Sequence, residues 1–309
     1  SAVKKAAATI TASDVARRVH VIADDSMMGR DTPSPGLEMT AQYVADQFKS
    51  FGLKPGGENG TWFQRYDILQ VQFDPAESHV GFMADGKHVH AEFTTDARFM
   101  GGTTPDKEIG GPVVVLGGKP NREALTGMDA AGKVVVVVMD YSKGPTAGGM
   151  GQMIGAVYAL HPLGVVILSN RDSAGWANRM KAPYRPGIRL AGAEGRPPVV
   201  EVNDAALASV LAAGGVDVAK IRADTSMVIL ADPGLKVMID VKETVLKKSS
   251  APNTIGILEG TDPKLKHEYL VYSAHMDHVG IASGKPDSIH NGADDDASGT
   301  VGVVELAEA

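Results

Sequence analysis

The chain has 309 residues, of which 43% are hydrophobic and 22% are charged, a composition typical of a globular protein with a sizeable core. At this length two domains are expected. The net charge of −7 and the lack of a Lys/Arg cluster argue against a nucleic-acid-binding surface. The absence of cysteine excludes disulfides, thiolate zinc sites and cysteine nucleophiles.

Two helices are predicted near the start of the chain. Residues 13–28 place Val15, Val19 and Ile22 on one face, with Ser13 as the cap. The second helix has Pro35 in its first turn and stops at Gly52. Its apolar face is formed by Leu37, Ala41, Val44, Ala45 and Phe48.

Strands are predicted from residue 62 onward. Residues 66–74 and 79–93 alternate between apolar and polar side chains, and Asp85-Gly86 marks a hairpin turn. The block 94–232 contains continuous β-branched runs, which are typical of strands covered on both faces. These runs span residues 112–118, 133–140, 164–170 and 198–203. The apolar run 153–168 is shorter than the roughly 20 residues that cross a bilayer, so no membrane span is expected.

The last part of the chain is predicted to contain strands over 235–246, 254–260 and 269–274, the last of which runs directly into His275. Residues 297–309 have the composition of a helix, in which Val301, Val304 and Leu306 are available for packing. Glu305 and Glu308 in this helix are interpreted as solvated side chains.

A candidate metal site follows the strand 269–274. His275 leaves the carboxyl end of that strand, where ligands bind in open α/β sheets. Asp277 is placed to hydrogen-bond the second ring nitrogen of His275, and the loop 290–299 brings further carboxylates. Clustered carboxylates repel one another unless a cation or protons are present, and mixed imidazole and carboxylate ligands suit zinc. The alternative is a solvated acidic loop.

Other histidines are weaker candidates. His88 and His90 share one strand face and are candidates for a surface metal site, although an exposed hairpin face is the simpler interpretation. His278 and His290 border the candidate site, either as contacts to a substrate or as ordinary loop residues.

The strings "YSAHMDHVG" and "HNGADDDASGT" resemble the co-catalytic zinc aminopeptidases of the M28 metallopeptidase family. The resemblance implies that His275 is a zinc ligand, that Asp277 orients it and that Asp295 bridges two zinc ions. It also implies a cis peptide bond between Asp295 and Asp296, with Asp296 beside the ligands.

The resemblance extends to the domain organisation. It implies an α/β fold in which a mixed-sheet zinc-exopeptidase domain of the phosphorylase/hydrolase-like type carries an inserted β-rich unit of the protease-associated (PA) type. The expected boundaries are residues 1–93 for the first peptidase segment, 94–232 for the insert and 233–309 for the second peptidase segment.

A complete family member continues with a Glu-Glu pair, an Asp and a His that finish the two-zinc site, and no matching Glu-Glu is present here. We therefore expect a zinc-dependent exopeptidase, an aminopeptidase acting on peptides, whose chain holds only part of the site and is inactive by itself. A C-terminal portion or another copy is expected to cover the exposed edge of the cut sheet.

Two other functions remain open. One is a non-catalytic, receptor-like binding protein that carries the same PA-type insert, and the other is an amide-processing relative similar to glutaminyl cyclases. The resemblance to exported bacterial proteins implies a periplasmic or secreted location.

Overall fold

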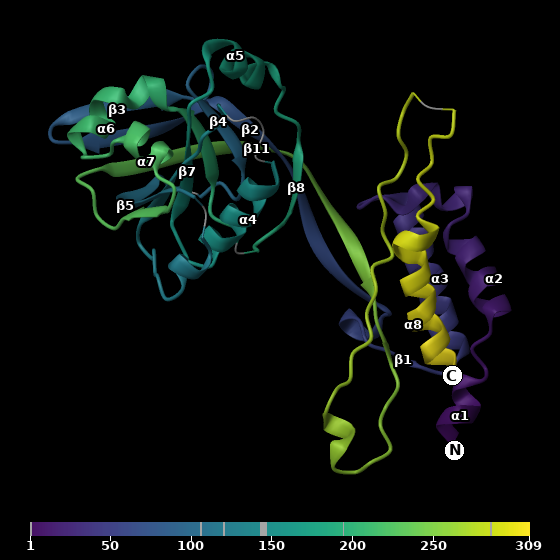
Figure 1. Cartoon of the computed structure of the whole chain (residues 1–309). Helices are drawn as coiled ribbons and strands as arrows, with labels where there is room; N and C mark the ends of the chain where they lie inside the picture. The colour runs from purple at the N-terminus through teal and green to yellow at the C-terminus, as the bar shows by residue number, and fades with distance from the viewer. Residues whose placement is uncertain (1, 106, 120, 143–146, 194, 285) are drawn as a thin grey trace. The chain divides into compact units, whose positions relative to one another are not determined.

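The computed structural model describes residues 2–309 apart from residues 106, 120, 143–146, 194 and 285 (Figure 1). The chain forms two compact units. Unit 1 comprises Ser1–Leu69, Ile188–Ala191 and Lys247–Ala309, and unit 2 comprises Gln70–Gly187 and Gly192–Leu246. The unit boundaries at 69/70 and 246/247 fall inside two long strands, whereas the sequence places domain boundaries at 93/94 and 232/233.

Unit 2 is built on a mixed sheet in the strand order β3-β2-β11-β5-β6-β7-β9-β4, and β10 pairs with β5. The pairs β5–β6, β6–β7 and β7–β9 are parallel, whereas the pairs β2–β3, β11–β5, β10–β5 and β4–β9 are antiparallel. This arrangement confirms the predicted mixed α/β fold class. The strands are β2 (Phe63–Ala84), β3 (Lys87–Glu92), β4 (Ala97–Gly101), β5 (Ile109–Gly118), β6 (Val134–Val138), β7 (Gly164–Ser169), β9 (Val199–Asn203), β10 (Met227–Leu230) and β11 (Lys236–Thr254).

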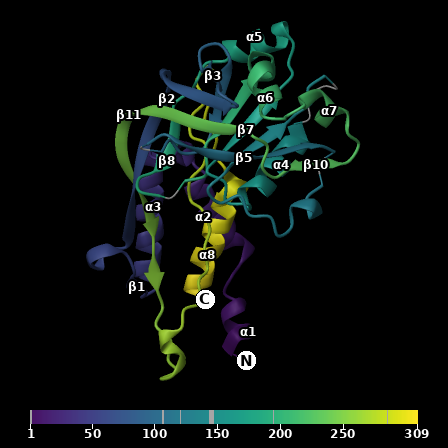
Figure 2. The same cartoon turned by 90° about the vertical axis from the view of Figure 1, so that its left-hand side faces the viewer.

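The continuous valine runs are buried on both sides of this sheet, as predicted. All five residues of β6 are buried, with Val136 in one apolar cluster and Val135 in the other. The helix α4 (Ala147–Tyr158) covers the face of Val135, and α6 (Ala208–Ala213) and α7 (Val218–Ala223) cover the opposite face (Figure 2). The helix α5 (Ser173–Lys181) completes the unit. Assignment of unit 2 to the PA type stays a prediction.

The predicted hairpin at Asp85-Gly86 is confirmed. Strand β2 ends at Ala84 and β3 begins at Lys87, so the loop has two residues, and both have positive φ, 44° and 71°. These angles match the type I′ turn that suits the twist of paired strands.

Unit 1 begins with helices whose bounds differ in part from the prediction. After α1 (Ala2–Ala7), helix α2 spans Ala12–Ile22, and its cap is Thr11 rather than Ser13, because the Thr11 side chain accepts from the Asp14 backbone N–H. The predicted extension to residue 28 is wrong. A short helical segment, η1 (Asp25–Arg30), replaces it, and its last three residues have positive φ, which a right-handed helix does not permit.

The second predicted helix is confirmed as α3 (Pro35–Ser50), with Ser34 as its cap and the whole predicted apolar face buried. The predicted C-terminal helix is also present, as α8 (Gly299–Glu308). Val301 packs with Ile22 of α2, and Val304 packs with Phe48 of α3, so the three helices lie side by side in both views (Figures 1 and 2). Leu306 is exposed, contrary to the prediction that it packs.

Of the strands predicted before His275, the one over 235–246 is present in β11, whereas those over 254–260 and 269–274 are largely absent from the described chain. Only β12 (Gly256–Ile257) forms in the region 254–260, where it pairs with β1 (Lys54–Pro55), and residues 269–274 are irregular. Tyr269, Leu270 and Val271 are 76–81% exposed. The prediction of a buried strand is wrong here because no described strand hydrogen-bonds this segment, and a strand buried on both faces needs such neighbours.

Unit 1 also contains η2 (Glu58–Gly60), η5 (Leu265–His267) and a π-helical turn, η6 (Ala293–Ser298), and it includes most of β8 (Gly187–Leu190), which pairs with β2. Within the described residues, no helix has the length and apolar character needed to cross a membrane.

Candidate metal centre

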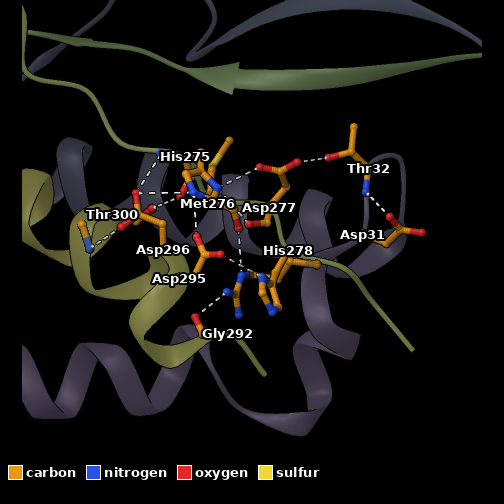
Figure 3. A network of polar contacts seen from close by, with 12 residues as sticks. Asp31, Thr32, His275, Met276, Asp277, His278, Gly292, Asp295, Asp296 and Thr300 are labelled. Carbon is orange, nitrogen blue, oxygen red and sulfur yellow. Dashed lines mark hydrogen bonds and ion pairs between the residues drawn. The ribbon is translucent and has the colours of Figure 1, made fainter. Parts of the chain in front are cut away.

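The backbone of His275 is fixed by the loop that follows it. The His275 amide donates to Oδ2 of Asp296 over 3.1 Å, and its carbonyl accepts from the Thr300 hydroxyl over 2.9 Å (Figure 3). Asp296 also accepts from the Gly299 amide over 3.0 Å, so one carboxylate joins His275 to the start of α8. The loop carrying Asp295 and the segment carrying His275 are therefore held together by their own polar groups.

Asp277 holds the imidazole of His275 from one side. Its Oδ1 lies 3.2 Å from Nδ1 of His275, and its Oδ2 accepts from the hydroxyl of Thr32 over 2.7 Å (Figure 3). A proton on Nδ1 that is donated to Asp277 leaves the lone pair of Nε2 free. This is the arrangement predicted for a residue that orients a metal-binding histidine.

Asp295 faces that free nitrogen. Its Oδ1 lies 2.9 Å from Nε2 of His275, and its Oδ2 lies 3.9 Å from Nδ1 of His278. The predicted cis peptide bond between Asp295 and Asp296 is present. Two acceptors, Nε2 and a carboxylate oxygen, thus meet in a position where a proton or a cation is needed between them.

The local charges favour a positive group at this point. Burial lowers the pKa of His275, but its hydrogen bonds to Asp277 and the charges of Asp296 and Asp277 outweigh that effect, so its pKa is raised above the ordinary value. The pKa of Arg30, by contrast, is lowered, because its burial outweighs the charges of Asp277 and Asp295, which act to raise it. The carboxylates therefore stabilise the positive charge on their neighbours.

Comparison with known proteins bears on this segment directly. Residues 253–309 match the sequence model of peptidase family M28. Residues 253–309, called the M28 segment below, contain His275, Asp277, Asp295 and Asp296, whereas Thr32 and Arg30 lie outside it. No curated protein matches the chain.

Several solved structures align with nearly the whole chain. An aminopeptidase from Aneurinibacillus sp. strain AM-1 shares 16% identity at a TM-score of 0.30, with 96% of this chain and 58% of that chain covered. A zinc aminopeptidase from Bacillus subtilis shares 17% identity at a TM-score of 0.30, with 96% and 57% covered. A peptidase M28 precursor from Shewanella amazonensis SB2B shares 12% at 0.33, with 94% and 60% covered. The chain spans less than two thirds of the length of each.

The M28 segment offers a partial fit to zinc. Two ligand atoms of one tetrahedral zinc ion lie about 3.3 Å apart, close to the 2.9 Å between Nε2 of His275 and Oδ1 of Asp295. Both atoms belong to ligand types that zinc prefers. Among the described residues, no group of three or more His, Cys, Asp or Glu side chains is arranged to hold a metal ion. The support for a metal site is therefore the pair formed by His275 and Asp295.

Of the two glutamates of α8, both interpreted from the sequence as solvated, only Glu308 is exposed. Glu305 is buried, 2% exposed, and forms an ion pair with the equally buried Arg18 of α2. Glu308 is exposed but bonds the same guanidinium. The prediction is wrong for Glu305 because amphipathic patterning within one helix does not reveal a charged partner on another.

The histidines of the hairpin lie in unit 2, in a surface pocket of about 250 Å³. His79 lies 3.5 Å from a carboxylate oxygen of Glu108, and the rings of His79 and His90 are 5.6 Å apart. His88 lines the same pocket. The arrangement falls short of a three-ligand group and agrees with the simpler interpretation of an exposed hairpin face.

Three residues that contact the site were not singled out from the sequence. Thr32 bonds Asp277, Thr300 bonds the His275 carbonyl, and Arg30 bonds the carbonyl of Met276. The motif "GRDTP" that contains Arg30 and Thr32 is visible in the sequence, but its contacts are more than 240 residues away.

Proposed function

We propose that this chain carries part of the active site of a zinc-dependent aminopeptidase, which removes N-terminal residues from peptides. The observation that supports this most directly is the meeting of Nε2 of His275 with Oδ1 of Asp295, with Asp277 behind the imidazole. The match of residues 253–309 to the model of peptidase family M28 supports the reaction class, which is hydrolysis of a peptide bond.

Each side chain has a defined role in this proposal. His275 and Asp295 would hold zinc through Nε2 and the carboxylate. Asp277 fixes the tautomer and direction of the His275 ring. Asp296 and Thr300 hold the backbone on either side of the His275 side chain. Zinc, when bound, supplies a Lewis acid for the peptide carbonyl and lowers the pKa of a bound water.

We further propose that the chain 1–309 is inactive by itself. A peptidase of this kind needs a carboxylate that takes a proton from the attacking water. Glu305 and Glu308 form ion pairs with Arg18, so the proposal assigns this role to neither of them. The base and the remaining ligands are then supplied by a C-terminal portion or by another copy of the chain.

Zinc content tests the proposal. The purified chain is loaded with zinc, dialysed and measured by mass spectrometry, and its affinity is determined by competition with a chromophoric chelator. H275A and D295N are expected to weaken binding by more than about tenfold, because each removes a ligand. The matched control is H267A, which removes an exposed histidine of the same unit. Equal zinc binding by H275A and H267A would contradict the proposal.

Activity is measured on an aminoacyl anilide. The chain alone is expected to release no anilide, and release is expected once the missing portion is co-expressed or added. If the H275A chain, combined with that portion, still hydrolyses the anilide, the activity resides at another site.

The exposed segment 269–274 is the proposed contact for that missing portion or copy. Val271 is 76% exposed within a run of apolar residues, and burial of such a run by a pairing strand is favourable. We expect reversible association in analytical ultracentrifugation, and we expect V271K to reduce it. The control is V3K, because Val3 is 77% exposed and lies in α1. An equal effect of both variants would rule out this contact.

The periplasmic or secreted location is also a proposal, and it rests on the family resemblance. Fractionation of the cells that produce the protein tests it, with the periplasm or medium as the expected compartment and the cytoplasm as the contradicting one.

A further inference from the structure

Arg30 is a fully buried arginine whose hydrogen bonds all go to backbone carbonyls. It is 0% exposed. Within the described part of the chain, none of its hydrogen bonds is made to a carboxylate. Its guanidinium donates to the carbonyl oxygens of Met276 at 2.8 Å, Ile22 at 2.7 Å, Asn291 at 2.6 Å and Gly292 at 2.9 Å. Burying a charged group is costly unless it is fully hydrogen-bonded, so the interaction is specific.

The four carbonyls come from segments that must meet for the candidate site to form. Met276 lies between His275 and Asp277. Asn291 and Gly292 immediately precede η6, the turn that carries Asp295. Ile22 ends α2. A planar guanidinium with five donors in a fixed geometry fixes the mutual positions of its acceptors, which a lysine does not do.

The backbone around Arg30 makes the same connection. The carbonyls of Gly29 and Arg30 accept from the amides of Gly280 at 2.9 Å and His278 at 3.0 Å. A Cβ atom on Gly29 would lie 2.4 Å from the Gly280 oxygen and 2.8 Å from the His290 oxygen, and its φ is +65°. Only glycine therefore fits this close approach.

A second contact supports the loop from the other side. The side-chain amide of Asn291 donates to the carbonyl of Ala23 and to Oδ1 of Asp25, both over 2.8 Å. Asn291 is thus bound to η1 both through its backbone carbonyl, by Arg30, and through its side chain, by Asp25.

We infer that Arg30 is the positioning residue of the candidate zinc site, which holds the His275 segment and the Asp295 loop at the separation at which Nε2 and Oδ1 meet. The inference rests on the proposed function where it concerns zinc. The role of Arg30 in holding the two segments together is supported by the hydrogen bonds alone. Arg30 itself lies outside the M28 segment.

Amide hydrogen exchange on the chain 1–309 tests the holding role without any metal. R30M removes the donors and keeps an unbranched, though shorter, side chain, and it is expected to accelerate exchange at His278, Gly280 and His290 by at least tenfold. R30K keeps the charge but not the fork, and an intermediate effect is expected. The control is R18M, which removes an arginine that is equally buried but is bonded to Glu305. R18M is expected to destabilise the fold, but not to accelerate exchange at these three amides selectively.

Unchanged exchange in folded R30M would overturn the inference, and so would an equal acceleration in R18M that is confined to these three amides. If R30M does not fold, R30K decides the question, because it retains a buried cation. Exchange at the three amides that is faster than in the unaltered chain supports the inference, and unchanged exchange overturns it.

Zinc affinity, measured with zinc chloride alone, tests the link to the site. R30M is expected to weaken zinc binding about 10–100-fold, as loss of an outer support for metal ligands does, and R18M to change it less than twofold. Failure of the unaltered chain to bind zinc would overturn the proposed function, while the exchange rates would still decide the role of Arg30. Zinc binding that is equal in R30M and the unaltered chain would overturn the positioning role.

Discussion

Arg18 and Glu305 form a buried ion pair that joins α2 to α8. R18M leaves a buried carboxylate without its partner and is expected to lower the free energy of unfolding by about 3–5 kcal/mol. The control is R17M, because Arg17 is exposed and its pair with Asp14 contributes at most about 1 kcal/mol. Urea denaturation measures both. The double variant R18M/E305M is expected to recover most of the loss, since it removes both charges, and no recovery would contradict this account.

Tyr141 of unit 2 gives a pH dependence. Burial, with the charge of Glu201 in support, raises the pKa of Tyr141 to about 12. Because the folded state favours the protonated phenol, its contribution to stability is complete below the unfolded pKa of about 10 and is lost as the pH rises through about 12. The measurement is the difference between the unaltered chain and Y141F, in phenolate absorbance and in stability. The difference in stability between the two proteins should change with pH only between about pH 10 and 12. A phenolate signal from Tyr141 near pH 10 would contradict the prediction.

At the scale of residues, the sequence identifies side chains whose partners are close along the chain. His275 and Asp277 are two residues apart, and the M28 motifs place Asp295 beside them. The sequence does not reveal the roles of Arg30 and Thr32, because their acceptors on Met276 and Asp277 lie about 245 residues away along the chain. Glu305 is misread for the same reason, since its burial depends on Arg18 of another helix.

Between the Asp295 loop and α8, Gly299 allows an approach that no other residue permits. A Cβ atom there would lie 2.2 Å from Oδ1 of Asp296. G299A is expected to displace the Asp296 carboxylate, weaken zinc binding at least tenfold and destabilise the start of α8. The control is G302A in the same helix, where a Cβ atom meets nothing within 4 Å. Because alanine is favoured over glycine inside a helix, G302A is expected to raise stability by up to about 1 kcal/mol.

Thermal unfolding and zinc titration of the two variants provide the measurements. Equal behaviour of G299A and G302A would show that the contact with Asp296 does not constrain the loop.

At the scale of elements, prediction succeeds where a segment carries its own signals. Helix α3 has a cap, a proline in its first turn and a continuous apolar face, and the β2–β3 hairpin has Asp85-Gly86. Prediction fails over residues 269–274, where the composition is that of a buried strand but no described strand provides hydrogen bonds. A strand depends on its neighbours, whereas a helix satisfies its own backbone.

At the scale of the whole molecule, each unit has its own core. Val136 is fully buried in unit 2, and V136A is expected to lower the stability of that unit by about 2 kcal/mol while exchange at the His278 amide stays unchanged. V301A makes the same truncation in unit 1, beside Ala297 of the Asp295 loop, and is expected to accelerate that exchange. Calorimetry and hydrogen exchange measure the two effects. Acceleration in V136A equal to that in V301A would show that the cores are coupled.

The bond between Arg30 and the Met276 carbonyl joins residues 246 positions apart. A ribosome adds about 5–20 residues per second, so about 12–50 s separate the synthesis of the two partners. During that interval the whole of unit 2 is made, while α2 and α3 are short helices that are marginally stable without a partner. The candidate site therefore assembles only after unit 2 has been made. Synthesis that stalls after residue 246 yields a molecule with a complete unit 2, in which Arg30 lacks its acceptors on Met276, Asn291 and Gly292.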